Sequence, residues 1–248
     1  MQKDYYQQYY KLEREHWWFQ VRGEIILEHI ESISKDFSGR LKILNIGVAT
    51  GHTSTLLSKI GDVKSVEYDK ECYEFTRQLP DMDIINASIT ELPFADETFD
   101  LVCAFDVVEH IADDVKAVSE MNRVCKKGGK LCVTVPAFML LWSEHDIINH
   151  HERRYTKPQL SALFADNELI FSTYFNFLLF LPIAAFRILK TAISGKPKVE
   201  DAQSDFMHLE QNIFTKLTRL IFAIEKPFLR NRIKFPFGVS ILLSAKKK

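Results

Sequence analysis

Histidines near the middle of the sequence are the first side chains that could move a proton. His110 follows one apolar, strand-like segment, and His145, His150 and His151 follow the next. Because an imidazole titrates near neutral pH, it can act as a general base. We take His110 and His145 as the catalytic candidates; the alternative for all four is a bond to loop backbone or exposure to solvent. Metal binding by His145, Asp146 and His150 lacks a clear ligand geometry, and we expect no metal.

A glycine-containing turn is the second candidate site. Gly47 and Gly51 lie between an apolar segment and a helix that opens near Thr53, where backbone can approach a ligand closely and N–H donors are unpaired. The spacing differs from the G-x-G-x-x-G that binds a dinucleotide. Glu67 lies about twenty residues farther on, where a carboxylate reaches the two hydroxyls of a ribose. Together they indicate a nucleoside-like ligand; a turn with a purely structural role is the alternative.

A parallel sheet is needed to bring these residues together. From Leu41 onward, short β-rich segments alternate with helical stretches, which is typical of a doubly wound α/β fold. Right-handed crossovers place the loops after the strands at one edge, where ligands bind. We predict strands at Leu41–Gly47, Val63–Tyr68, Asp83–Ala87, Phe99–Asp106, Lys130–Pro136, Leu169–Phe175 and Val239–Ala245, and helices at Lys3–Ile33, Thr53–Ile60, Lys70–Leu79, Ile111–Val124, Lys157–Ala165, Leu178–Ile193 and His208–Leu229. Gly128 and Gly129 are expected to end the helix before the fifth strand.

The composition excludes several classes of protein. The 248 residues are 46% hydrophobic, with 32 basic against 33 acidic side chains, so we expect neither a disordered chain nor a nucleic-acid partner. The four cysteines form no C-x-x-C pair, which indicates a reducing, cytoplasmic location, and the N-terminus has no pattern of a secretory signal. The most apolar segment, Phe177–Phe186, is about half the length of a membrane-spanning helix.

The segment from Leu41 to Pro136 resembles the core of the class I S-adenosylmethionine-dependent methyltransferases. Four pieces carry the resemblance in the family's order: LNIGVATG (44–51), VEYD (66–69), ELPFADETFD with FDVVEH (91–100 and 105–110), and RVCKKGGKL (123–131). The chain departs from the pattern at Asn45, Ala49 and Ser88, which replace an acid, a glycine and an aspartate. The loss of a charged hydrogen bond at Asn45 or Ser88 costs on the order of 1 kcal/mol, which weakens cofactor binding without abolishing it.

This resemblance implies a cofactor, S-adenosylmethionine, that leaves as S-adenosylhomocysteine. It implies that Glu67 binds the ribose, that Ser88 and Ile89 bind the adenine, and that the Gly47 turn binds the amino-acid part. It also implies a Rossmann-like sheet of seven strands whose last strand is antiparallel. The implied cofactor-binding residues are Asn45, Gly47, Val48, Gly51, Glu67, Tyr68, Ser88, Ile89, Asp106 and Val107.

The outer segments resemble a narrower group of bacterial and archaeal methyltransferases that is associated with surface-polysaccharide or glycolipid genes. The matching motifs are EREHWWFQVR (13–22), LWSEHD (141–146) and HHERRYT (150–156). Two arginines with a tyrosine can clamp a carboxylate or phosphate of the acceptor, or can pair with Glu144, Asp146 or Glu152 to hold the loop. The candidate substrate-binding residues are Trp18, His151, Arg153, Arg154 and Tyr155.

The whole chain, 1–248, is interpreted as one methyltransferase domain. It comprises an aromatic N-terminal helical lid (1–38), a cofactor-binding core (40–137) and a helical cap inserted before the last strand (178–235). The lid closes over the cofactor or only packs on the sheet. The cap is a buried or dimer-forming element, or it makes peripheral contact with a membrane through its apolar and basic residues.

The sequence therefore predicts transfer of a methyl group to a small-molecule, glycan or lipid-linked acceptor, at oxygen. One alternative is a catalytically inactive cofactor-binding fold that acts as an interaction module. A nicotinamide-dependent oxidoreductase lacks the pyrophosphate loop and the Tyr-x-x-x-Lys pair that it would need.

Overall fold

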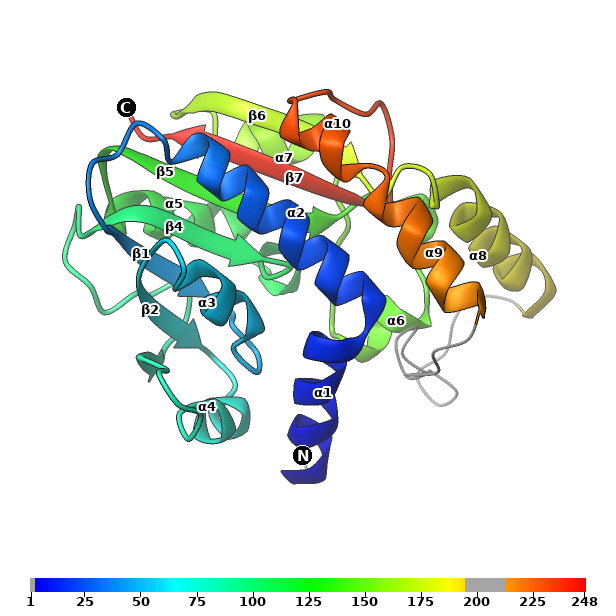
Figure 1. The fold of residues 1–248 in the computed structure, drawn as a ribbon, viewed down its shortest axis with the longest axis horizontal. Coiled ribbons are helices and arrows are strands. Elements are labelled where there is room, and N and C mark those ends of the chain that lie inside the picture. Colours follow the sequence, from blue (N-terminus) through cyan, green and yellow to red (C-terminus); the bar gives the residue numbers. More distant parts are fainter. Residues whose placement is uncertain (1–2, 195–212) are drawn as a thin grey trace.

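The protein contains one seven-stranded sheet with helices on both faces (Figure 1). The structure, a computed structural model, describes residues 3–194 and 213–248. The strand order is β3-β2-β1-β4-β5-β7-β6, and β7 runs antiparallel to both of its neighbours. The predicted Rossmann-like sheet with an antiparallel last strand is confirmed. The strands are β1 (Leu41–Ile46), β2 (Gly61–Glu67), β3 (Ile84–Asn86), β4 (Phe99–Phe105), β5 (Cys125–Pro136), β6 (Glu168–Phe175) and β7 (Ser240–Lys246).

Two separate hydrophobic cores lie on the two faces of the sheet. On one face, α2 (Trp17–Ile33) runs across the strands beside α3 (His52–Leu57), α9 (Ile213–Ala223) and α10 (Lys226–Arg230) (Figure 1). On the other face, α5 (Asp114–Val124) and α7 (Lys157–Leu163) pack against β4, β5 and β7. Central strands covered on both sides need apolar residues at nearly every position. This explains why β1 and β4 are almost continuously buried.

The connection between β4 and β5 differs from the prediction. A short 3₁₀ turn, Val108–His110, precedes α5, which begins at Asp114 because the side chain of Asp113 accepts a hydrogen bond from the backbone N–H of Lys116. The helix then ends at Val124, before the glycine pair, and β5 already begins at Cys125, which pairs with Phe99. Gly128 adopts a φ of +75° inside this strand, so the glycines form an irregular turn in β5 and do not terminate the helix.

The cap also differs from two continuous helices. The first cap helix, α8, spans Phe180–Ser194, and the second is broken into α9 and α10 around Glu225, with Pro227 at the start of α10. The predicted start of the second helix at His208, and the polar segment before it, lie outside the described residues. The loop after β5, for which no helix was predicted, contains a 3₁₀ turn (Met139–Leu141) and the short helix α6 (Glu144–Ile148).

Remaining differences from the sequence-based boundaries are small. α3 begins at His52 and ends at Leu57, α4 spans Lys70–Thr76, and α7 ends at Leu163. The predicted N-terminal helix is two helices, α1 (Lys3–Glu15) and α2, because His16 leaves the helical conformation and its side chain accepts a hydrogen bond from the backbone N–H of Trp18. This break lets α1 turn toward the edge of the sheet where β1 and β2 end (Figure 1).

Phe222 joins the cap to the sheet, and its removal should destabilise the fold. The ring is fully buried between Phe175 of β6 and Trp17 of α2, with centroids 6.3 Å away in both pairs. We expect Phe222→Ala to lower the free energy of unfolding by about 3–5 kcal/mol, because it leaves a cavity in a closed core. Leu220→Ala, on the exposed side of α9, should change it by less than about 0.5 kcal/mol. Denaturant titration measures both; equal effects would contradict this packing.

Candidate functional site

The glycine turn after β1 fits closely against the end of β4. Gly47 has a φ of +66°, and a Cβ atom there would lie 2.4 Å from Cγ2 of Val107. Gly51 has a φ of +83° and starts α3, and Ala49 between them also takes a left-handed conformation, at +47°. The turn therefore needs glycine at 47, both for its backbone angle and for the contact with Val107.

Glu67 connects the two turns that follow β1 and β2. One carboxylate oxygen accepts a hydrogen bond from the backbone N–H of Ala49, and the other from that of Asp69, both at 2.9 Å. Burial raises the pKa of Glu67, although these N–H groups oppose the shift. Each oxygen has a second lone pair. The carboxylate is thus held in place with acceptor capacity for two hydroxyls, while the neighbouring Tyr68 ring is largely exposed.

Two other predicted cofactor residues are engaged within the fold. Asn45 is buried, and its amide donates to the hydroxyls of Thr53 and Ser54, both at 2.9 Å, which ties β1 to α3. The Ser88 hydroxyl lies 2.7 Å from that of Thr90. Ile89 is buried in the core below α5. Their predicted roles toward a cofactor stay predictions.

Asp106 directly follows β4 and connects the N-terminal helices to the sheet through an ion pair. It adopts a φ of +56°, and its carboxylate lies 2.6 Å from a guanidinium nitrogen of Arg22 on α2. The hydroxyl of Thr134 on β5 donates to the other carboxylate oxygen and accepts from Arg22, both at 3.0 Å. Trp18 lies over the same guanidinium, 5.4 Å from ring centroid to carbon.

The helix α1 contacts both turns beside Glu67. The Thr50 hydroxyl donates to the carboxylate of Glu13, and Arg14 donates to the carbonyl of Thr50 at 3.1 Å. The Tyr6 hydroxyl donates to Asp69 at 2.9 Å. Closure of α1 and α2 over a cofactor stays a prediction. The contacts show that α1 lies against the glycine turn and the turn after β2.

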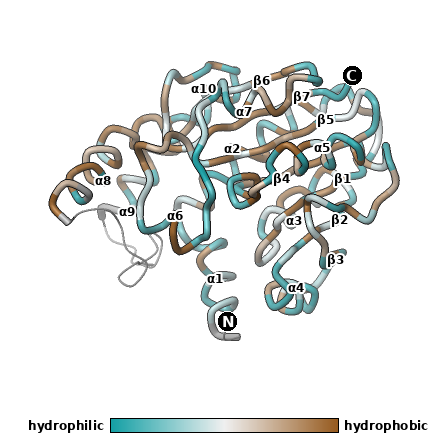
Figure 2. Tube along the Cα trace, turned by 180° about the vertical axis from the view of Figure 1, so that it is seen from behind, coloured by the Kyte–Doolittle hydropathy of each residue, from teal (hydrophilic) through white to brown (hydrophobic). Residues whose placement is uncertain are grey.

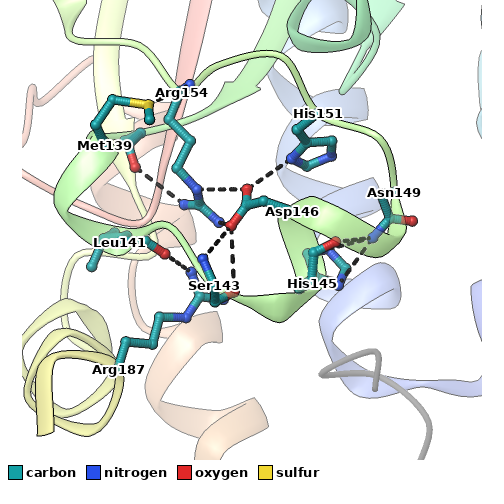
Figure 3. A network of polar contacts seen from close by, with 10 residues as sticks. Met139, Leu141, Ser143, His145, Asp146, Asn149, His151, Arg154 and Arg187 are labelled. Atoms are coloured by element: carbon teal, nitrogen blue, oxygen red, sulfur yellow. Dashed lines mark hydrogen bonds and ion pairs between the residues drawn. The ribbon is translucent and has the colours of Figure 1, made fainter. Parts of the chain in front are cut away.

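A buried carboxylate organises the loop after β5 (Figure 3). Asp146 accepts hydrogen bonds from Arg154 at 2.7 and 3.0 Å and from the backbone N–H of Ser143 at 2.8 Å, and lies 2.8 Å from Nδ1 of His151. Burial alone would raise the pKa of Asp146, but His151 and Arg154 outweigh it and hold the pKa well below its usual range. Arg154 therefore holds the loop, which is one of the two interpretations of the sequence.

Arg153 and Tyr155 meet at another carboxylate. Arg153 lies 2.8 Å from Asp114 and also donates to the carbonyl of Ala112, while the buried Tyr155 donates to Asp114 at 2.7 Å. These contacts connect the loop to the start of α5. A role for Arg153, Arg154 and Tyr155 in substrate binding stays a prediction.

Three histidines gather between the ends of β4 and β5. The rings of His110 and His151 meet edge to face with centroids 4.6 Å apart, and the ring of His145 lies 6.0 Å from that of His151. Burial, with a contribution from His151, lowers the pKa of His110 to about 4, so its ring is neutral at physiological pH. His150 is exposed.

Three charged side chains near the site received no role from the sequence. They are Glu13 and Arg22 on the N-terminal helices and Glu109 in the turn after β4. Each is a charged residue that the fold buries. Their apolar neighbours in the sequence, such as Val21 and Ile25 around Arg22, could have indicated that they are buried. A buried charge needs a specific partner.

The comparisons with known proteins agree with this geometry. The sequence model of a family described as "Methyltransferase domain" matches residues 44–133, which contain the glycine turn, Glu67 and Asp106. Over these residues the chain is similar to the class I S-adenosylmethionine-dependent methyltransferases. A probable S-adenosylmethionine-dependent methyltransferase of Mycobacterium tuberculosis is 27% identical over 161 residues, 62% of this chain and 56% of that protein.

Other relatives have names that state different activities. A phosphatidylethanolamine N-methyltransferase of Cereibacter sphaeroides is 32% identical over 99 residues, 37% of this chain and 49% of that protein. The solved structure of an S-adenosylmethionine-dependent methyltransferase from Thermotoga maritima superposes with a TM-score of 0.58 at 15% identity, over 99% of this chain and 96% of the other, and shows the shared fold. The chain spans about half the length of these curated relatives.

The residues of this chain fit the family's cofactor, S-adenosylmethionine. Glu67 offers two held oxygens for the ribose hydroxyls, and the glycine turn lies one strand away. Asp106 and Val107 close the same edge from β4. When bound, this cofactor would supply an electrophilic methyl carbon on a sulfonium.

Glu13 should make the stability of this protein depend on pH. Burial raises the pKa of Glu13 to about 7 from an ordinary value of 4.5, although Thr50 and Arg14 oppose the shift. The folded protein therefore holds this proton more tightly than the unfolded chain. The resulting stabilisation is complete below about pH 4.5 and is lost as the pH rises through about 7.

We expect the wild type to lose up to about 3 kcal/mol more stability than Glu13→Gln across this range, at about 1.4 kcal/mol per pKa unit. Denaturant titrations between pH 4.5 and 8 measure it. Glu15→Gln, an exposed acid on the same helix, should keep the wild-type slope. A wild-type slope in Glu13→Gln would show that Glu13 is not the titrating group.

Proposed function

We propose that the protein transfers the methyl group of S-adenosylmethionine to a hydroxyl oxygen of a lipid-linked or glycan acceptor at a membrane surface. The observation that carries the transferase part is the convergence of the glycine turn, Glu67 and Asp106 at adjacent strand ends within the matched domain. The buried contacts of α1 and α2 with these residues support a site that excludes water.

The histidines beside Asp106 support transfer at oxygen. A hydroxyl is a poor nucleophile until its proton leaves, so it needs a nearby base. In the proposed reaction the acceptor oxygen attacks the methyl carbon, the bond from that carbon to sulfur breaks, and the hydroxyl proton passes to His110 or His145. S-adenosylhomocysteine and the methylated acceptor are then the products.

The proposed membrane contact rests on the exposed faces of α8 and α9. These helices lie at the same end of the molecule, and the trace of α8 is largely hydrophobic (Figures 1 and 2). Lys216 and Arg219 are exposed on α9 among these apolar positions, and no acidic residue occurs within either helix. Apolar side chains that enter a bilayer, with basic ones at its phosphates, bind anionic membranes. The large exposed apolar residues are Leu181, Phe186, Ile188, Leu189 and Ile193 on α8 and Leu217 and Leu220 on α9.

Two further facts bear on this proposal. Among the described residues, none of the helices has the length and apolar character to cross a bilayer. One relative is named for phosphatidylethanolamine, a lipid, and another, from Renibacterium salmoninarum, for demethylmenaquinone, a quinone with an apolar tail. They support an acceptor with an apolar part, which a peripheral protein would meet at the membrane surface, on the cytoplasmic side.

Flotation with vesicles tests the membrane contact. We expect the wild type to float with vesicles that contain phosphatidylglycerol and not with pure phosphatidylcholine, and to be released by high salt, because each basic residue near the surface contributes about 1 kcal/mol. Phe186→Asp and Leu220→Asp should abolish flotation. Val115→Asp, equally exposed on α5, should leave it unchanged. Equal flotation of all variants, or none by the wild type at low salt, would contradict the contact.

The same vesicles, loaded with a bacterial lipid extract and S-adenosylmethionine labelled at the methyl carbon, test the acceptor. Label in the lipid phase, lost in Phe186→Asp and kept in Val115→Asp, is the expected result. Label confined to water-soluble products would replace the lipid-linked acceptor with a soluble one.

A further inference from the structure

Glu109 is a buried acid for which the described residues supply no polar partner. Its side chain is fully buried in the turn after β4, and neither carboxylate oxygen accepts a hydrogen bond from any described residue. An ionised carboxylate in such a position is strongly unfavourable. Either a proton or a cation must neutralise it.

The buried arginines nearby are already matched by other acids. Arg22 pairs with Asp106 at 2.6 Å, and Arg154 pairs with Asp146 at 2.7 Å. The opposite charges within each of these two pairs cancel, so neither arginine compensates the negative charge of an ionised Glu109. A divalent ion would compensate it and would also need ligands besides one carboxylate.

His110 and His151 supply such ligands. One ligand atom from each of Glu109, His110 and His151 lies within 4.8 Å of the other two. A zinc ion, with bonds of about 2.0–2.2 Å, draws its ligand atoms to roughly 3.3 Å apart, so small side-chain rotations close the site. The sequence spacing does not reveal this set, because His151 comes from the loop after the next strand.

Asp146 orients His151 in the manner of a metal ligand (Figure 3). It lies 2.8 Å from Nδ1, which leaves Nε2 as the other polar atom of the ring. Asp146 is itself held by Arg154 and by the backbone N–H of Ser143. A carboxylate that fixes one ring nitrogen of a histidine while the other binds metal is a recurring arrangement in metalloproteins.

We propose that Glu109, His110 and His151 bind a divalent transition-metal ion, for which Zn²⁺ is the best match. Two imidazoles and one carboxylate form a ligand set used by catalytic zinc, which keeps a further position for a non-protein oxygen. That oxygen would belong to the acceptor hydroxyl, a step that rests on the proposed function, and the proton would then pass to His145 rather than His110.

Metal binding can be measured without cofactor or acceptor. The full chain, without a histidine tag, is stripped with a chelator, dialysed against Zn²⁺ and analysed by mass spectrometry; Co²⁺ is titrated in parallel and followed by its visible absorption. We expect one ion per chain and a Co²⁺ spectrum typical of low coordination number. A metal content near zero, or a Co²⁺ spectrum like that of the aqueous ion, would overturn the proposal.

Matched variants locate the ion. His151→Asn keeps a donor toward Asp146 but lacks Nε2, and Glu109→Gln keeps the volume; both should lose the stoichiometric ion. His150→Asn should retain it, because His150 is exposed and has a φ of +55°, which asparagine tolerates. Equal loss in His150→Asn, or full retention in a folded His151→Asn, would overturn the assignment. If the protein binds S-adenosylhomocysteine but not Zn²⁺, only the proposed metal site is wrong. If it binds Zn²⁺ but not S-adenosylhomocysteine, only the proposed function is wrong.

Discussion

The contact on which the site depends is the ion pair between the buried Arg22 and the partly exposed Asp106. It joins a helix that precedes the sheet to the end of the central strand β4, and the Thr134 hydroxyl extends it to β5. A buried ion pair contributes little net stability, but the loss of one partner leaves a charge in the core and is costly. The pair therefore helps to fix where the N-terminal helices lie, and with them Glu13 at the glycine turn and Tyr6 at the turn after β2.

The acids at the carboxyl edge of the sheet differ in role because their partners differ. Glu67 is held by two backbone N–H groups, Asp106 by Arg22, and Asp146 by Arg154, His151 and Ser143. Glu109 lies between the last two with no such partner among the described residues. One edge of the sheet thus carries a carboxylate held by backbone N–H groups, a fixed ion pair and an acid without a hydrogen-bond partner among the described residues.

The sequence predicts the sheet well because buried parallel strands need continuous apolar segments, and the glycine turn because its backbone needs glycine at 47. It predicts the end of α5 at Val124, but it starts β5 at Lys130 instead of Cys125, since the Gly128 turn inside the strand has the same residue signal as a helix end. It also misses what depends on contacts across the fold. Arg22 meets Asp106, and His151 meets Glu109, only after folding, and spacing along the chain carries no trace of either.

We infer that Glu67 and the glycine turn form the site for S-adenosylmethionine. Calorimetric titration of the full chain with S-adenosylhomocysteine tests it most directly, with Glu67→Ala, the exposed Glu74→Ala as matched control, and NADH as a parallel ligand. We expect micromolar binding to the wild type and to Glu74→Ala, and no binding of NADH. In Glu67→Ala the binding should weaken at least about tenfold, because charged hydrogen bonds are lost. Wild-type affinity in Glu67→Ala would contradict it.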